Sequence, residues 1–187
     1  MNLKNIKQSL LGLFLAIFIT SFSNAQSKIQ VSAFGGYSDD GFATLANFAF
    51  SNHDIKDSFF EAGVYAGFLE ERNTSYNVDV NVFSLNFGYF KRLPFLSSSQ
   101  DVMLLHAGIG GLFGKEIINN GLNELPNGAL IKTNDGTIYG GFASLQGDLR
   151  LNDKLSLLAR YNQFYHANSE TNRFKMFVGI GVKFLIF

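Results

Sequence analysis

The sequence predicts an all-β fold: an eight-stranded, antiparallel, up-and-down β-barrel of the outer-membrane type, preceded by a cleaved signal peptide. Three observations predict it. Residues 1–25 are organised as an export signal, eight later segments alternate apolar and polar residues, and the composition is apolar and poor in charge. Of 187 residues, 47% are hydrophobic and 16% charged. This content excludes disorder, and it is low in charge beside the roughly 25% usual for soluble domains.

The export signal comes first. Two lysines precede the apolar run 10–19, and the tripeptide Ser23-Asn24-Ala25 supplies the small residues of a cleavage site. A membrane-anchoring helix is the weaker alternative, because the run is shorter than the roughly 20 residues that a bilayer span needs. We therefore expect cleavage before Gln26, and a mature barrel domain of residues 26–187 with two more acidic than basic side chains.

The mature chain alternates with a period of two instead of showing helical periodicity. The last segment is the clearest, since Met176, Val178 and Ile180 share one face while Lys175 and Gly179 lie on the other. Similar alternation recurs along the chain between polar connectors. The expected strands are 29–37, 42–51, 58–69, 78–91, 102–115, 137–151, 155–166 and 174–187.

The fourth of these strands is irregular. Val78, Val80 and Val82 occupy one face, and from Phe83 onward the apolar residues occupy the other. Such a slip indicates either a β-bulge or apolar side chains that fill the inside of the barrel.

Two connectors carry further information. The segment 152–154 has the composition of a tight hairpin, and the connector 116–136 is long and rich in Asn and Gly. If both chain ends lie on the periplasmic side, the long connector faces outside, as in outer-membrane barrels.

Alternation alone does not decide which face meets water, since a soluble lipocalin-like barrel turns its apolar face inward. The length of the strands, the scarcity of charge on their polar faces and the aromatic terminus at Phe187, a feature that assembly machinery commonly recognises, favour the membrane. A cation on the lipid face costs about 2–4 kcal/mol at mid-bilayer. We therefore expect Arg150 and Arg160 to point inward, with Glu61 and Asp148 available as counter-ions.

Few residues are candidates for chemistry. The chain has no Cys, and its three histidines, His53, His106 and His166, lack the spacing of a zinc site. The glycine-rich segment 108–114 opens no helix and lacks the Lys-Ser/Thr ending of a phosphate loop, so its glycines are expected to make room in a small barrel. His166 with Ser169 and Glu170 is the only hydrolase-like cluster, and it has no nucleophile-elbow motif.

These observations predict a non-enzymatic protein. We expect no catalytic, cofactor-binding or metal-binding residues, no cofactor and no small-molecule substrate. Because Lys+Arg and Asp+Glu are equal at 15 each, direct nucleic-acid binding is not expected either. The expected partners are outer-membrane lipid and other envelope proteins.

The connectors are the remaining places where function could reside. Asp39-Asp40 and residues 119–134, together with Glu116 and Glu124, are either ordinary solvated turns or exposed loops that contact a partner.

Five segments of the chain together carry a resemblance to a known family. They are His106-Ala107-Gly108-Ile109-Gly110-Gly111, Gly114-Lys115-Glu116-Ile117-Ile118-Asn119-Asn120-Gly121, Ile138-Tyr139-Gly140-Gly141, Leu151-Asn152-Asp153-Lys154-Leu155 and Gly179-Ile180-Gly181-Val182-Lys183-Phe184. With these segments the sequence resembles the TraO family of conjugal transfer proteins encoded by conjugative transposons of Gram-negative bacteria. The resemblance covers roughly residues 58–187, and it implies an envelope or outer-membrane component of a DNA transfer apparatus, with no catalytic residue to carry over. General surface barrels for adhesion or envelope stability, and lipid-modifying barrel enzymes, remain the alternatives.

Overall fold

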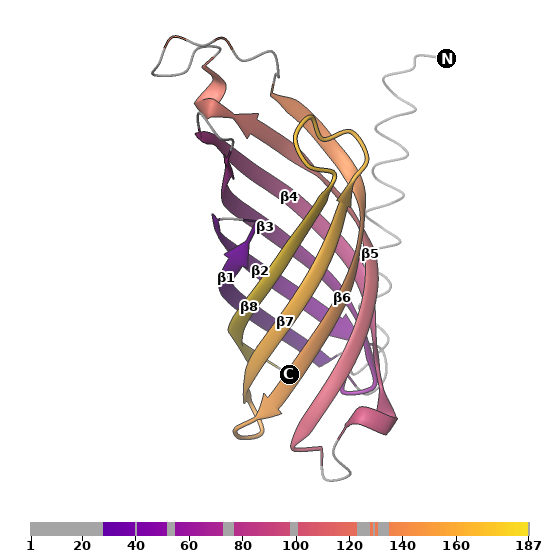
Figure 1. The fold of residues 1–187 in the computed structure, drawn as a ribbon. Helices are drawn as coiled ribbons and strands as arrows, with labels where there is room; N and C mark the ends of the chain where they lie inside the picture. The colour runs from indigo at the N-terminus through magenta and orange to yellow at the C-terminus, as the bar shows by residue number, and fades with distance from the viewer. Residues whose placement is uncertain are drawn as a thin grey trace, which may run out of the picture.

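The chain forms a closed barrel of eight antiparallel strands in a computed structural model (Figure 1). Every strand pairs with its sequence neighbours, and β1 pairs with β8 from Gln30–Leu185 to Tyr37–Val178, which closes the barrel. The predicted fold class is therefore confirmed. The structure describes residues 28–39, 41–51, 55–72, 77–97, 101–122, 128, 130 and 135–186, so the expected signal peptide and the terminal Phe187 lie outside the described residues. The strands are β1 (Lys28–Ser38), β2 (Gly41–Ser51), β3 (Ser58–Arg72), β4 (Asn77–Arg92), β5 (Met103–Ile118), β6 (Gly136–Arg150), β7 (Leu155–His166) and β8 (Phe174–Leu185).

Two single-turn 3-10 helices, η1 (Pro94–Leu96) and η2 (Asn119–Gly121), complete the described secondary structure. Within the ranges given above, no helix is both long and apolar enough to cross a membrane.

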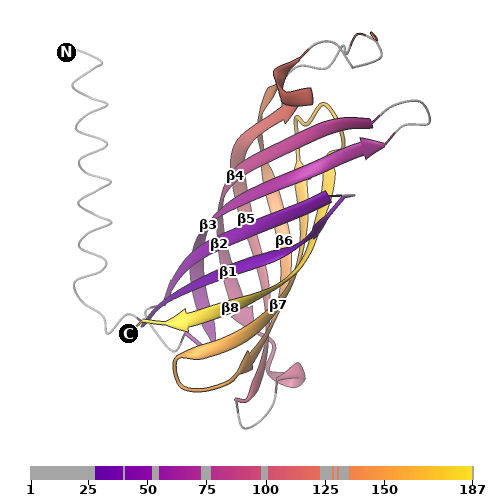
Figure 2. The ribbon, with the colours of Figure 1, turned by 90° about the vertical axis from the view of Figure 1, so that its left-hand side faces the viewer.

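The two ends of the barrel differ. β1 begins and β8 ends at the same end, which we call the terminal end (Figure 2). The β2–β3, β4–β5 and β6–β7 connectors also lie there, whereas the remaining four connectors lie at the opposite end, called here the loop end. The long β5–β6 connector is at the loop end, opposite the start of β1 and the end of β8, as expected from the sequence.

The β6–β7 hairpin is the tight turn that the sequence predicts. The Asn152 side-chain oxygen accepts hydrogen bonds from the backbone N–H groups of Lys154 (2.9 Å) and Leu155 (2.8 Å). The Leu151 N–H donates to the Leu155 carbonyl at 3.0 Å. An Asn side chain that mimics a backbone turn in this way stabilises a short reversal.

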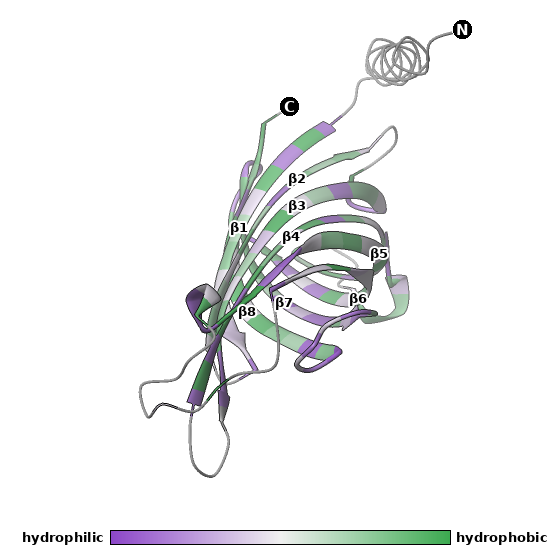
Figure 3. Ribbon diagram, turned by 90° about the horizontal axis from the view of Figure 1, so that it is seen from above, coloured by the Kyte–Doolittle hydropathy of each residue, from purple (hydrophilic) through white to green (hydrophobic). Residues whose placement is uncertain are grey.

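Large apolar side chains cover the outside of the barrel. Ile109 and Ile180 are each 71% exposed, and Phe87 is 59% exposed, on strands β5, β8 and β4. Hydropathy consequently alternates in bands along the strands (Figure 3). A soluble barrel would bury this face, so the arrangement is that of an outer-membrane barrel rather than a lipocalin-like one.

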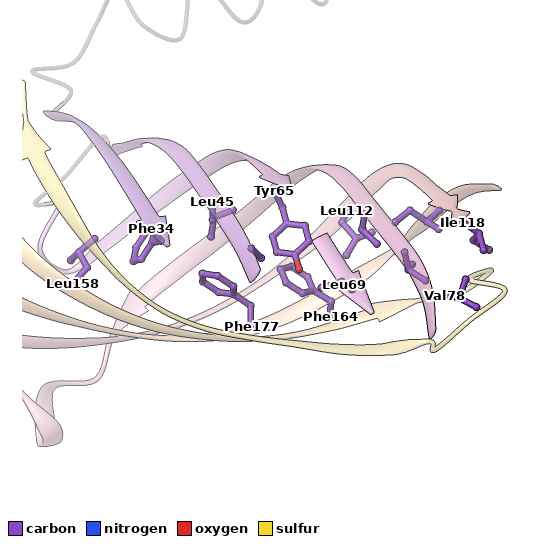
Figure 4. Close-up of a cluster of buried hydrophobic side chains, with 14 residues drawn as sticks. Phe34, Leu45, Tyr65, Leu69, Val78, Leu112, Ile118, Leu158, Phe164 and Phe177 are labelled. Carbon is purple, nitrogen blue, oxygen red and sulfur yellow. The ribbon is translucent and has the colours of Figure 1, made fainter. Parts of the chain in front are cut away.

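The interior is filled by side chains along its length. A single cluster of buried residues runs from Leu158 past Phe34, Phe177 and Tyr65 to Ile118 (Figure 4). The Tyr65 and Phe164 rings pack with their centroids 5.0 Å apart. This packing matches the expectation that eight strands leave only enough room for side chains.

The irregularity in β4 is apolar filling, and the bulge alternative is wrong. The β3–β4 register is unbroken from Ser58–Lys91 to Arg72–Asn77. Val78, Val80 and Val82 are buried in the interior near the loop end, while the outward positions before Phe83 are polar. β4 thus extends past the apolar belt, where its outer face becomes polar and its inner face packs against other aliphatic side chains.

Candidate functional site

The polar side chains of the barrel gather inside it, at three levels along its axis. The central level is an ion pair between Arg160 on β7 and Glu61 on β3. The two guanidinium N–H groups donate to the two carboxylate oxygens at 2.8 and 2.9 Å, and the side chains are 1% and 7% exposed. The guanidinium carbon lies 4.9 Å from the Phe34 ring centroid and 4.7 Å from that of Phe90. The inward orientation of Arg160 and its counter-ion are as predicted.

Nearer the terminal end, Asp148 on β6 pairs with Lys183 on β8. Asp148 is one of the predicted counter-ions for the inward-facing arginines, including Arg150. It lies two residues from Arg150 on the same strand face, but the Lys183 ammonium takes the carboxylate. Arg150 makes no ion pair within the described part of the chain.

Nearer the loop end, Glu116 on β5 is 1% exposed and holds the β7–β8 connector. Its carboxylate accepts hydrogen bonds from the Ser169 hydroxyl (3.0 Å) and the Thr171 hydroxyl (2.9 Å). The Lys175 ammonium lies 3.3 Å from the same carboxylate and donates to the Thr171 hydroxyl at 2.9 Å. Several charge-assisted hydrogen bonds on one buried carboxylate fix this connector over the barrel.

The expectation that Glu116 belongs to an exposed loop is therefore wrong. The strand continues to Ile118, two residues beyond Glu116, and the period of two turns Glu116 inward. Asp39, from the first loop-end connector, accepts a hydrogen bond from the Met176 N–H at 3.2 Å. Asp40 and Glu124, which belong to the same expectation, lie outside the described residues.

The hydrolase-like cluster is not assembled. Ser169 donates to Glu116, and Glu170 uses its backbone N–H to contact the same carboxylate at 3.3 Å. His166 is buried at the end of β7, and its Nδ1 atom has no hydrogen-bond partner in the described chain. In this cluster His166 would have to take the proton of Ser169, but its ring makes no hydrogen bond with that hydroxyl, which donates to the Glu116 carboxylate.

His106 is not arranged as a metal ligand. His106 is interior on β5, as expected, where its Nε2 atom lies 2.8 Å from the Lys56 carbonyl oxygen and its ring packs edge-on against Phe59. His53 lies outside the described residues. Among the residues that the structure describes, no group of three or more His, Cys, Asp or Glu could hold a metal ion.

The glycine-rich segment of β5 is strand, as expected. A side chain at Gly108 would place its Cβ 2.5 Å from the Phe90 ring. This glycine therefore makes room for an interior aromatic ring beside the central ion pair, which leaves the phosphate-loop interpretation without support.

A network of charges lies at the terminal rim. Arg92 and Lys56 approach the two Asp101 oxygens at 2.8 and 3.2 Å, and tie the β2–β3 and β4–β5 connectors together. The hydrogen bond from Lys56, followed by that from Arg92, holds the pKa of the Asp101 carboxyl below its usual range. This network links two connectors at one edge of the barrel.

The two mouths of the barrel have opposite charge. A cavity of about 200 Å³ at the loop end is lined by Asp39, Glu70, Glu71 and Lys175. A cavity of about 210 Å³ at the terminal end is lined by five basic residues and one acidic residue, namely Lys28, Lys56, Arg150, Lys154, Lys183 and Asp153. These two mouths, rather than a catalytic centre, are the candidate functional surfaces.

The class of protein is defined by the closed eight-stranded barrel with its apolar wall outward and its charges paired inside: it is an outer-membrane-type β-barrel. Solved structures agree on the fold. A major outer membrane protein from Thermus thermophilus is similar with a TM-score of 0.59, 10% identity, and coverage of 86% of this chain and 99% of that one. Neisserial surface protein A is similar with a TM-score of 0.54, 14% identity, and coverage of 84% and 96%. No curated protein sequence matches the chain significantly.

The chain belongs to the TraO family of conjugative transposon proteins, whose family model matches residues 22–186. The resemblance found in the sequence over residues 58–187 is confirmed, and it extends through the first strands.

Proposed function

We propose that the protein is a non-enzymatic outer-membrane component of a conjugal DNA transfer apparatus, and that it acts through its structure and through contacts of its connectors with other envelope proteins. The family match over residues 22–186 carries this proposal, because it ties nearly the whole mature chain to conjugative transposons.

Placement in the outer membrane is supported by the outer wall of the barrel. Exposed Phe, Leu, Ile and Val side chains on its strands would be unfavourable in water, at roughly 25 cal/mol for each Å² of apolar surface left exposed. Residues 1–25 supply the matching export signal, with cleavage before Gln26. The chain ends are then periplasmic, and the loop end faces outside.

A structural rather than catalytic role is supported by the way the interior polar groups are used. Glu61, Glu116 and Asp148 each pair with a cation from another strand, and Ser169 caps Glu116. Groups committed to such pairs fix the strands and connectors, and the aromatic filling between them leaves no room for a wide channel. We accordingly expect neither turnover nor conductance from the purified protein.

The proposal is tested by deleting the gene from a donor strain that carries the transposon. Transfer is expected to fall to the background level while growth and viability stay normal, and the gene supplied in trans should restore it. A gene lacking codons 2–25 serves as the matched control, since its product cannot be exported and should not restore transfer.

Normal transfer from the deletion strain would overturn the proposal. If that strain instead loses adhesion or envelope integrity, the alternative of a general surface barrel takes its place. A change in lipid profile that is reversed by the wild-type gene but not by a His166→Ala variant would favour the lipid-modifying alternative.

A further inference from the structure

A pocket of about 210 Å³ lies at the terminal mouth of the barrel. Its wall comes from five neighbouring strands of the barrel, which contribute Lys28 (β1), Lys183 (β8), Ser156 (β7), Arg150 (β6) and Leu104 (β5). Three of these residues are adjacent across the sheet: Arg150 pairs with Ser156, and Ser156 with Lys183. The β2–β3 connector and the β6–β7 hairpin complete the rim.

The wall of the pocket has more basic than acidic side chains, even after its known ion pairs are taken into account. Lys183 is neutralised by Asp148 and Lys56 by Asp101, both from outside the pocket wall. Arg150 and Lys154 are further cations of the wall, which has one acidic residue, Asp153. Arg150 and Lys154 make no ion pair with any residue that the structure describes. An excess of positive charge in a recess with low-dielectric walls concentrates anions there.

Two polar wall residues add hydrogen-bonding groups to the charges. Gln30 and Ser156 are each 4% exposed and line the cavity of about 210 Å³. An amide and a hydroxyl can both donate and accept hydrogen bonds, so a ligand that enters the cavity can bond to them.

The wall also has an apolar part, which selects among anions. Leu104 and Ile55 are 1% and 6% exposed, and they line the pocket with Leu185. Inorganic phosphate makes no use of such a surface. A peptide does, because it presents carboxylates to the cations, amides to Gln30 and Ser156, and an apolar side chain to the leucines.

We propose that this terminal pocket binds an acidic peptide segment of a periplasmic partner protein, with an apolar side chain next to its carboxylates. The inference rests on the proposed function in one respect, that the terminal end faces the periplasm. The inference names the chemistry of the periplasmic partner: acidic side chains next to an apolar one.

The test uses the full mature chain, purified in detergent, and fluorescence anisotropy of a labelled peptide in which two glutamates alternate with leucines. The same peptide with glutamines is the matched control. The glutamate peptide is expected to bind about tenfold more tightly, and added salt should weaken its binding. Equal binding of the two peptides would overturn the proposal.

Variants locate the site. Arg150→Gln combined with Lys154→Gln is expected to weaken binding of the glutamate peptide about tenfold, and Ser156→Leu should weaken it by filling the pocket without a change of charge. Lys91→Gln removes an exposed cation from the outer face of β4 and should leave binding unchanged. Each variant is first checked for heat-modifiable migration, which reports a folded barrel. Unchanged binding in both pocket variants would overturn the proposal.

Two further outcomes distinguish other ligands. Displacement of the peptide by inorganic phosphate as effectively as by unlabelled glutamate peptide, at matched ionic strength, would assign the pocket to phosphate and overturn the peptide proposal. Capture by phosphatidylglycerol vesicles that depends on Arg150 would assign it to a lipid headgroup, with the same consequence. Loss of transfer in the deletion strain together with no peptide binding would leave the proposed function standing and remove only this inference.

Discussion

Glu61→Gln is expected to destabilise the barrel by about 3 kcal/mol, because it leaves the guanidinium of Arg160 without its counter-ion at the centre of the barrel. Breaking a buried pair by removing one partner costs about 3–5 kcal/mol. Here both side chains are less than one-tenth exposed, so water cannot replace the carboxylate. The Phe34 and Phe90 rings compensate in part, by about 0.5–2 kcal/mol each, which places the loss at the low end of that range.

The free energy of unfolding is measured by urea titration of the protein in lipid vesicles. The chain has no Trp, so tyrosine fluorescence and the mobility of unboiled samples on gels are the suitable signals. Lys91→Gln on the outer surface is the control, with an expected change below about 0.5 kcal/mol. The double replacement Glu61→Leu with Arg160→Met should recover most of the loss, because it removes both charges and keeps the volume.

A Glu61→Gln barrel as stable as the wild type would refute this reasoning. So would a double variant less stable than the single one, since the penalty would then come from lost packing rather than from the unpaired charge.

The wall, the interior and the rim each offer a further test. Ile109→Lys, on the exposed apolar wall, should lower the free energy of unfolding in vesicles by about 2–4 kcal/mol, seen as a reduced folded fraction on gels. An unchanged folded fraction would contradict the outward, lipid-facing position of this residue. Gly108→Ala should lower the free energy of unfolding in urea titration by about 1–3 kcal/mol, because the added Cβ meets the Phe90 ring. Gly147→Ala is the control and should be nearly neutral, since the nearest atom to its Cβ is 3.9 Å away. Equal effects of the two substitutions would contradict the interior packing. The ion pairs of Asp101, whose pKa is lowered in the folded state, stabilise the rim above the unfolded-state pKa and are lost as the pH falls through the folded-state pKa. Hydrogen exchange in the 93–102 connector should therefore speed up on acidification, and Asp101→Asn should show fast exchange already at neutral pH; exchange that is slow and independent of pH would count against these ion pairs.

Most of the fold can be predicted from the sequence because the period of two is a direct consequence of strand geometry. Alternation predicts eight strands with ends within a few residues of those observed, and it places Glu61, His106 and Arg160 inside. It does not report the height along the barrel, which is why the valines at the start of β4 break the simple pattern. Above the apolar belt the outer face is polar and the interior is aliphatic, so the apparent faces exchange.

The pairing of the interior charges is harder to predict, because it depends on which strands approach each other inside the lumen. Arg160 and Glu61 are separated by 99 residues in the sequence. Asp148 pairs with Lys183 and not with Arg150, although Arg150 is only two residues away in the sequence. The role of Glu116 depends on the path of the 167–173 connector, which alternation does not constrain. The basic pocket at the terminal end arises from five strands and two connectors, so no single segment of the sequence reveals it.

The central claim, a closed barrel with its apolar wall in the outer membrane, is tested most directly by fractionating cells and comparing boiled with unboiled samples of the native protein on gels. We predict that the protein is found in the outer-membrane fraction and that the unboiled form migrates differently from the boiled one, as a folded membrane barrel does. Recovery in the soluble periplasmic fraction, with a migration that boiling does not change, would contradict the claim.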